Sequence, residues 1–328
     1  MKTNLAASIT KAASKQSYYT IRFLVDRERI EDAYRAYGYF RWVDDVLDAA
    51  SSSGPMLPAL AARPGSEGEA FERRAFLERQ KSLLDSCYRG EPRPDVTLQE
   101  QMLVELVQHD PDKNSGLQSY LRNLMLVMEF DAQRRGALIS QFELSEYTRW
   151  LAIAVTDGLH YFIGHGAFAP HDETRYQAVA AAHITHMLRD TYDDVQAGYY
   201  NIPREVLEAH HIGPQDVHSQ AYRLWVKNRV QLARQYFEAG HVYFGRVQSW
   251  RHRLAGLAYI ARFEWQLETF EREGYLLRPA YRERKGIGTG LRMSWLAFSS
   301  LLSLRGVGAP SQPMAEFGKE LPQRPGKA

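Results

Sequence analysis

The sequence predicts an all-α protein, because apolar residues recur at helical steps of three and four over most of the chain. Strand-like alternation is nearly absent from the sequence. Breaks rich in glycine, proline and polar residues, at 51–69, 89–94 and 110–116, separate the periodic segments. The expected architecture is therefore a helical bundle without a sheet.

The periodic segments divide the chain into ten predicted helices, which span 18–49, 70–89, 96–109, 116–135, 143–168, 173–197, 203–210, 215–247, 249–274 and 280–304. The first helix carries an apolar flank beside a stripe of aromatic residues, and the next three are bounded by the breaks named above. The helix over 173–197 should end near Gly198, and Pro203 opens the next one. The break at 51–69 fits either a surface loop or a mobile lid over a site.

Composition limits the class of protein. The chain has 328 residues, of which 45% are hydrophobic, so it can bury a sizeable core. Its 41 basic and 39 acidic residues leave a net charge of +2, which argues against a nucleic-acid partner recognised through bulk charge. The single cysteine, Cys87, excludes an internal disulfide framework, and the N-terminal sequence has no secretory signal. We expect a cytoplasmic protein.

We expect one domain over 1–308 and a disordered, proline-rich tail over 309–328. No segment reaches the roughly 20 apolar residues that spanning a bilayer requires. The apolar segment 293–304, flanked by two arginines, indicates either a buried terminal helix or a peripheral membrane contact.

A first aspartate cluster, Asp44, Asp45 and Asp48, lies near the end of the predicted helix 18–49. Carboxylates four residues apart point to one side of a helix. Steps of four and three leading to them form one stripe, which comprises Ile30, Tyr34, Tyr37, Arg41, Asp44 and Asp48. We therefore expect the acids to face the interior of a bundle, where carboxylates need partners or metals. Arg41 is placed to pair with Asp45 or with a phosphate.

A second cluster follows the same rule in the predicted helix 173–197. Steps of three and four connect His183, His186, Asp190 and Asp194, and Arg189 lies next to that face. Two acidic helix faces repel each other unless cations lie between them, and Mg2+ binds through carboxylate and phosphate oxygens. The sequence therefore predicts a metal-bridged diphosphate site, with two solvated acidic turns as the alternative.

The segments SKQSYYTIRFL, YRAYGYFRWVDDVLD and HMLRDTYDDVQAGYYNIP resemble the motif regions of the squalene/phytoene synthase family. The resemblance covers about 17–280, and the chain is identified as a divergent member, similar to class I trans-isoprenyl diphosphate synthases. It implies a single isoprenoid-synthase-type bundle around a central cavity. It also implies an enzyme that uses Mg2+, or Mn2+, to bind and ionise an allylic prenyl diphosphate.

The resemblance also assigns roles to individual residues. The metal-facing and catalytic acids would be Asp44, Asp48, Asp190 and Asp194. The positions that match family residues near the diphosphate are Ser17, Tyr37, Arg41 and Arg189. Basic residues also follow EREGY, as in the family, and the alternative for them is a solvated basic turn; they are Arg278, Arg282 and Lys285.

The sequence departs from the family pattern at three places. His186 stands where the family has a metal-binding asparagine, so His186 would be an altered ligand, a general base or a core histidine. After Tyr147, bulky residues replace the family's glycines at Trp150, Ile153 and Thr156. The sequence GYYNIP replaces an arginine and a tyrosine with Tyr199 and Asn201. These changes put the condensation with a second prenyl diphosphate in doubt more than the ionisation of the first.

Four functions follow as hypotheses. The leading one is a Mg2+-dependent prenyltransferase that joins two prenyl diphosphates 1′ to 1, as in squalene or phytoene formation. The second is transfer to a non-isoprenoid aromatic acceptor, with His186 as base. The third is a di-iron oxidase built on two Glu-x-x-His pairs, Glu208/His211 and Glu238/His241. The fourth is a non-catalytic binder of prenyl lipids.

Overall fold

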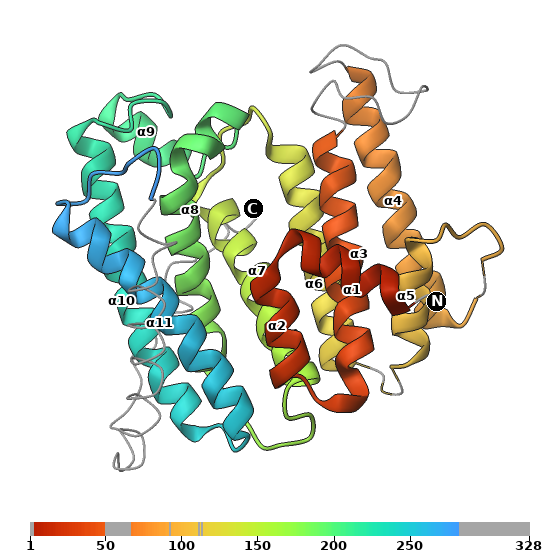
Figure 1. Ribbon diagram of the computed structural model, residues 1–328. Coiled ribbons are helices and arrows are strands. Elements are labelled where there is room, and N and C mark those ends of the chain that lie inside the picture. The colour runs from red at the N-terminus through yellow and green to blue at the C-terminus, as the bar shows by residue number, and fades with distance from the viewer. Residues whose placement is uncertain (1–2, 50–66, 92, 111, 113, 282–328) are drawn as a thin grey trace, which may run out of the picture. The chain divides into compact units, whose positions relative to one another are not determined.

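The computed structural model describes residues 3–49, 67–91, 93–110, 112 and 114–281. Within these residues the chain forms eleven α-helices, two 3-10 turns and no strand (Figure 1). The elements are α1 (Thr3–Ala13), α2 (Lys15–Leu24), η1 (Arg27–Arg29), α3 (Ile30–Ala49), α4 (Glu67–Arg89), α5 (Glu100–Gln108), α6 (Gly116–Arg134), α7 (Gln141–Phe162), η2 (Glu173–Tyr176), α8 (Gln177–Ala197), α9 (Arg204–His210), α10 (Gln220–Arg246) and α11 (Trp250–Arg272). The predicted all-α fold class is confirmed.

Several helices begin where side chains can satisfy the free backbone N–H groups of a first turn. Ser115, Ser219 and Ser249 accept hydrogen bonds at the starts of α6, α10 and α11. At the start of α5, the Thr97 N–H donates to Glu100 Oε2, and the Glu100 N–H donates to Thr97 Oγ1. This reciprocal arrangement is a capping box, and it fixes the start of α5.

The prediction of one helix over 18–49 is wrong. The helical segment breaks at Val25 and Asp26, and α1 and α2 form a separate pair of helices before α3. The Asp26 carboxylate, which is buried, accepts hydrogen bonds from the Gly164 N–H at 3.2 Å and the His165 N–H at 2.9 Å. The Asp26 N–H also donates to the Phe162 carbonyl at 2.9 Å, so the backbone at this point bonds to a distant segment and not along a continuous helix.

The described helices group into two compact units whose boundary falls within α7. The first unit comprises Met1–Gly136 and Ile153–Ala167, and the second comprises Ala137–Ala152 and the chain from Phe168 onward. Each unit has a buried apolar core of its own. The single domain predicted over 1–308 stays a prediction.

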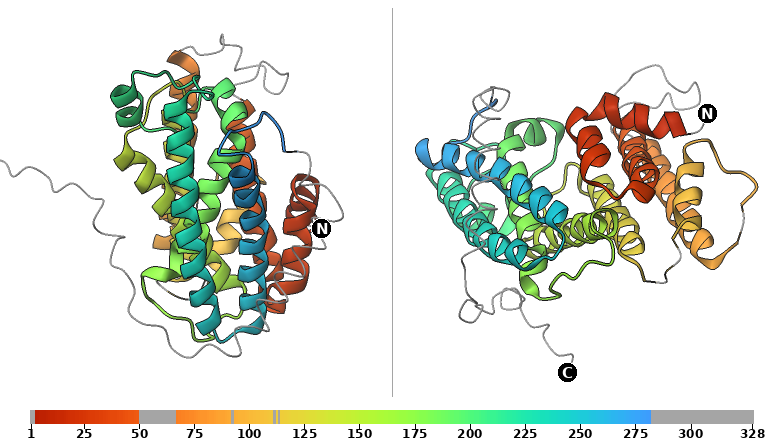
Figure 2. Two further views of the ribbon diagram at one scale, coloured as in Figure 1. Left: turned by 90° about the vertical axis from the view of Figure 1, so that its left-hand side faces the viewer. Right: turned by 60° about the horizontal axis from the view of Figure 1, so that its bottom comes forward.

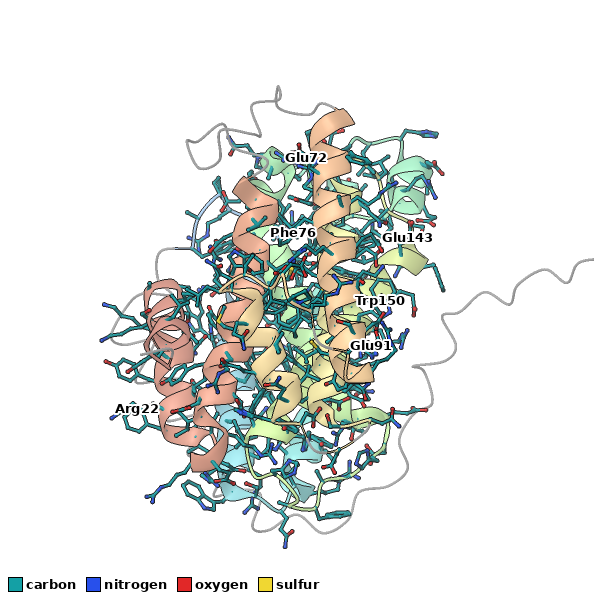
Figure 3. All side chains as sticks on the ribbon, turned by 90° about the vertical axis from the view of Figure 1, so that its right-hand side faces the viewer. Arg22, Glu72, Phe76, Glu91, Glu143 and Trp150 are labelled. Carbon is teal, nitrogen blue, oxygen red and sulfur yellow. The ribbon has the colours of Figure 1, made fainter. Side chains whose placement is uncertain are left out.

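In the first unit, α3 contacts α1, α2, α5 and α6. Gly38 faces α1, and a Cβ there would lie in ordinary van der Waals contact, 3.4 Å from Ala6 Cα. Phe76 points from α4 toward α3, where its ring meets Trp42 at a centroid distance of 5.4 Å (Figure 3). These contacts hold α3, which carries the first aspartate cluster, against several neighbours.

In the second unit, α8 lies beside α10 and α11, and the latter two run side by side (Figure 2). The close approach requires glycine, because a Cβ at Gly256 would lie 2.2 Å from the Phe244 ring. A Cβ at Gly240 would likewise lie 2.8 Å from Ala178 Cβ. The second aspartate cluster therefore lies on a helix that is tightly packed along most of its length.

Some sequence predictions fall outside the described residues. They are most of the loop or lid at 51–69, most of the helix over 280–304 with the apolar segment 293–304, and the tail over 309–328. The described ends differ from the prediction, since residues 67–69 already belong to α4 and residues 280–281 are not helical. In the described part of the chain, no helix combines the length and apolar character that crossing a bilayer requires.

Candidate active site

The first aspartate cluster occupies the last two turns of α3 as described. Asp44 and Asp48 lie one turn apart on the same side of the helix. Arg41 Nη1 donates to Asp44 Oδ2 at 3.2 Å, and Arg41 Nη2 donates to Asp45 Oδ1. The predicted pairing of Arg41 with Asp45 is confirmed. The prediction that these acids face the interior is wrong in part, because Asp48 is exposed and the Asp44 side chain is 43% exposed.

The electrostatics of this helix end disfavour ionised carboxylates. Burial, and then the neighbouring Asp48 carboxylate, raises the pKa of Asp44 to about 6. Asp45 and Asp131 add to the rise, and Arg41 opposes it. Desolvation of its carboxylate by neighbouring atoms also raises the pKa of Asp48, although the residue as a whole is exposed. The cluster is therefore short of positive charge, which a cation would supply.

Two residues at the end of α6 act on this cluster, and neither could be identified from the sequence. Asp131 lies in the last turns of the helix, and Arg135 is its C-cap. The Asp131 carboxylate raises the pKa of both Asp44 and Asp48, and Arg135 lowers the pKa of Asp48. They come from a helix that starts about seventy residues after α3 ends. Helical periodicity places residues on a face but does not say which faces meet, so only the structure could find them.

Two of the predicted diphosphate-binding residues also lie in the first unit. Tyr37 lies one turn before Arg41 on α3, and its hydroxyl interacts electrostatically with the Arg41 guanidinium. Ser17 lies in the first turn of α2, where its N–H and hydroxyl both approach Ser14 Oγ, at 3.1 and 2.9 Å. Ser17 therefore belongs to the cap of α2, and its role toward a diphosphate stays a prediction.

The second aspartate cluster lies near the end of α8. Arg189 Nε donates to Asp190 Oδ1 at 2.6 Å, and Arg189 Nη2 donates to Asp190 Oδ2, so the pair is bidentate. Asp194 Oδ2 accepts from Asn201 Nδ2 at 2.7 Å. Gly198 ends α8 in the left-handed conformation with φ 87°, as the sequence predicted. Both acids of this cluster therefore have a hydrogen-bond donor.

Asn201, which stands in place of a tyrosine of the family pattern, supports this cluster through Asp194. It is 3% exposed and holds Asp194 from the loop after α8. The last turn of α8 contains no basic residue, and the negative end of a helix dipole disfavours a carboxylate. The Asn201 amide offsets part of that cost.

His186 lies one turn before Asp190. Its Nδ1 is 3.3 Å from Arg189 Nη2, and its ring contacts Phe263 of α11 at a centroid distance of 4.8 Å. Because a guanidinium can only donate, Nδ1 is the acceptor. While this contact is made, Nδ1 can neither bind a metal ion nor take a proton. The ligand and base roles predicted for His186 therefore require its Nε2 or a movement of Arg189.

Arg189 also lines a solvent-open hollow between α8 and α11. The hollow is shallow, and its lining combines polar and aromatic side chains. The lining residues are Thr185, Arg189, Arg262, Phe263, Trp265 and Gln266. The buried Nε2 of Gln266 has no hydrogen-bond partner among the residues that the structure describes, and a bound water would satisfy it.

The donor atoms of both clusters suit a hard divalent ion. The described residues contain no group of three or more His, Cys, Asp or Glu side chains placed to hold a metal. Mg2+, however, is usually bound through one or two carboxylates together with substrate phosphates and water. Each cluster by itself offers two aspartates on one helix, which fits that requirement, and the raised pKa of Asp44 marks where positive charge is lacking in the first.

The two Glu-x-x-His pairs do not form the kind of site that the di-iron hypothesis requires. Glu208 and His211 are both exposed at the end of α9. His241 Nε2 lies 3.1 Å from Glu264 Oε1, an ordinary pairing between α10 and α11. A di-iron centre needs more carboxylate and histidine ligands in one place than these described pairs provide.

Of the basic residues after α11, the structure describes one. Arg278 Nε lies 2.9 Å from Glu273 Oε2, and the Arg278 guanidinium lies over the Tyr281 ring at 4.8 Å. Arg278 is therefore engaged by its own segment. Arg282 and Lys285 lie outside the described residues.

The chain is similar to known proteins in both sequence and fold. The sequence profile of one family, described as squalene/phytoene synthase, matches residues 10–285. The structure is similar to the crystal structure of squalene synthase HpnC from Alicyclobacillus acidocaldarius, with 18% sequence identity and a TM-score of 0.65. That match covers 84% of this chain and 95% of that one, and at this identity it establishes the fold. A search of curated proteins found no match.

Proposed function

Because the chain belongs to the squalene/phytoene synthase family, we propose that it ionises an allylic prenyl diphosphate with the help of bound Mg2+. The family makes it a transferase of prenyl groups, and the identity of metal and substrate is our proposal. The metal ligands we propose are Asp44, Asp48, Asp190 and Asp194. Mn2+ has the same preference for carboxylate oxygens and is the expected substitute.

One observation carries the proposal more than any other. Burial and the Asp48 carboxylate raise the pKa of Asp44 to about 6, in a cluster whose only direct cationic contact described here is Arg41. Ionising these neighbouring carboxylates costs free energy because their charges repel, and a bound cation would remove that cost. A cation with an attached diphosphate would supply that charge and bring the substrate to the same helix end.

The chain's own residues then have defined tasks. Loss of diphosphate builds negative charge on the leaving group, and a bound divalent ion contributes positive charge that stabilises it. Arg41 and Arg189 carry the guanidinium groups of the two clusters. Arg41 donates to Asp44 and Arg189 to Asp190, and a bound metal would compete for both carboxylates. Aromatic side chains such as Phe263 exclude water from the neighbourhood of a reactive cation.

For the acceptor, we propose the family default, a second prenyl diphosphate joined 1′ to 1. The alternative, an aromatic acceptor deprotonated by His186, is less well supported, since Nδ1 already accepts from Arg189. The family also disfavours the hypothesis of a non-catalytic binder. Product identification distinguishes all three, because only the first gives a hydrocarbon or alcohol made of two prenyl groups.

The test is release of inorganic diphosphate from allylic donors of increasing chain length, with Mg2+ or Mn2+. The intact protein is compared with Asp48→Ala and with Asp85→Ala. Asp85 is a half-exposed aspartate of α4 that pairs with Arg122, so it controls for the loss of one surface carboxylate from the same unit.

We expect metal-dependent release from one donor length, lost in Asp48→Ala and kept in Asp85→Ala. Release that is unaffected by Asp48→Ala would contradict the assigned site. An absence of release from every donor with both metals would contradict the ionisation step itself.

A further inference from the structure

One face of α2 is both aromatic and basic. Tyr19 and Phe23 are 50% and 68% exposed, and their rings stack at a centroid distance of 6.1 Å. Lys15 lies one turn before Tyr19 and Arg22 next to Phe23, and both are exposed. Figure 3 shows Arg22 at the outer edge of its helix. We call Lys15, Tyr19, Arg22 and Phe23 the aromatic-basic face.

The opposite side of α2 is committed to the fold. Ile21 is buried, and Tyr18 stacks on Tyr34 of α3 at 5.4 Å. The Tyr34 hydroxyl also donates to the Tyr18 carbonyl at 3.2 Å. The helix is therefore fixed in orientation, and the aromatic-basic face points away from α3.

The sequence of α1 and α2 is basic. The first 25 residues contain four basic side chains and no aspartate or glutamate, and the first exposed acid that follows in the sequence is Glu28 of η1. Lys11 of α1 is exposed and lies over the Tyr18 ring at 5.5 Å, and that ring meets the Tyr19 ring at a centroid distance of 5.4 Å. Single exposed aromatics are common on soluble proteins, so the basic neighbours are what set the stacked pair apart.

We propose that the aromatic-basic face binds the surface of an anionic lipid bilayer. Aromatic rings partition into the boundary between headgroups and acyl chains, while lysine and arginine extend to lipid phosphates. The negative potential of an anionic membrane attracts each nearby basic side chain. An α-helix lying flat with its outer face in that boundary has the geometry of α2.

A second exposed aromatic residue, Phe71, lies in a different charge environment. Phe71 on α4 is 73% exposed, which exceeds the exposure of Phe23. The first turns of α4 carry Glu67, Glu69 and Glu72 together with Arg73 and Arg74, so an anionic surface would repel part of that helix. Exposure alone therefore does not select a membrane face, and charge complementarity favours α2.

The experiment is co-sedimentation of the full chain with vesicles of phosphatidylcholine, alone or mixed with phosphatidylglycerol, at low and high salt. Tyr19→Ser/Phe23→Ser removes the rings, Lys15→Gln/Arg22→Gln removes the charges, and Phe71→Ser is the matched control. We expect salt-sensitive binding to the anionic vesicles only. Each double variant should weaken it about ten-fold or more, and Phe71→Ser should leave it unchanged.

A second measurement protects the test against misfolding of the ring variant. Phe23→Trp keeps an aromatic ring, and its fluorescence should be quenched by brominated lipid in anionic vesicles, while that of Phe71→Trp should not. Failure of the intact protein to bind any vesicle would overturn the proposal. So would equal binding by all variants, which would place the contact in another part of the chain.

Discussion

The two aspartate clusters have the same spacing but different local support. At the end of α3, Asp44 has a pKa raised to about 6, and only Arg41 among its described contacts supplies positive charge. At the end of α8, Asp190 has a bidentate arginine and Asp194 has a buried amide. In the first cluster one arginine serves two aspartates, whereas in the second each of the two acids has a donor of its own.

The difference indicates a division of labour between the clusters. Carboxylates that repel one another gain most when a cation arrives, so the α3 cluster should contribute most to metal affinity. The carboxylates of the α8 cluster are already oriented by hydrogen bonds, so they should lose little conformational freedom when they bind a metal and should determine its position.

The largest effect is expected from Asp44→Asn. Removing one negative ligand should lower the rate of metal-dependent diphosphate release by about a thousand-fold. The same change removes a carboxylate that burial and Asp48 disfavour, so the metal-free protein should unfold at a higher temperature. Diphosphate release and thermal unfolding without metal are the two measurements.

Asp194→Asn is the matched comparison in the second cluster. It should also reduce activity, but without the gain in stability, because Asp194 already has a donor in Asn201. A lower unfolding temperature for Asp44→Asn would show that the α3 cluster is compensated after all.

The next effect tests the support of the second cluster. Asn201→Ala removes the amide that donates to Asp194 Oδ2 at 2.7 Å, so the carboxylate loses its orientation. Partners behind a metal ligand typically affect metal affinity by about ten-fold or more, and we expect a loss of this size. Metal titration of activity measures it, with Asn123→Ala on α6 as a control, since Asn123 donates only to Ser119. Unchanged metal affinity would remove Asn201 from the site.

The features that could be predicted from the sequence are those whose interacting residues lie close together along the chain. Starts and ends such as those at Ser115 and Gly198 are local signals, and they were predicted to within a few residues. The break at Asp26 was missed because the groups it binds are 138 and 139 residues away. No periodicity in residues 18–49 could contain that information.

The same limit applies to the site. The shared face of Asp44 and Asp48 follows from helical spacing, and the pairing of Arg41 with Asp45 follows from a separation of four residues. Asp131 and Arg135 act from another helix, and Asn201 acts from a loop whose path a helical pattern does not describe. The squalene/phytoene synthase resemblance is confirmed by the family profile, but neither found these supporting residues.

A smaller effect concerns pH. The pKa of Asp44 in the folded protein is about 6, above its ordinary value of 3.8. Between pH 4 and pH 6, therefore, Asp44 keeps its proton in the folded state but has lost it in the unfolded state. The resulting stabilisation is fully present below pH 4 and is lost as the pH rises through 6. With a discount for the exposure of Asp44, the loss should be about 1 kcal/mol. Urea unfolding of the metal-free protein at several pH values measures it.

Asp44→Asn should flatten this dependence on pH, because the variant has no carboxyl group to titrate at that position. Saturating Mg2+ should also flatten it by favouring the ionised form. If the intact protein and Asp44→Asn lose equal stability over this range, the titrating group is another one.

The smallest effect is expected from His186→Asn. An asparagine oxygen can accept from Arg189 as Nδ1 does now, and it is a harder ligand than imidazole. The Mg2+ concentration for half-maximal activity should therefore fall about three-fold, whereas that for Mn2+, which tolerates nitrogen ligands better, should change less. His218→Asn, which alters an exposed histidine bonded to Tyr192, is the control. Equal shifts for both metals would show that ligand hardness is not what His186 controls, and its effect would then come from the orientation of Arg189.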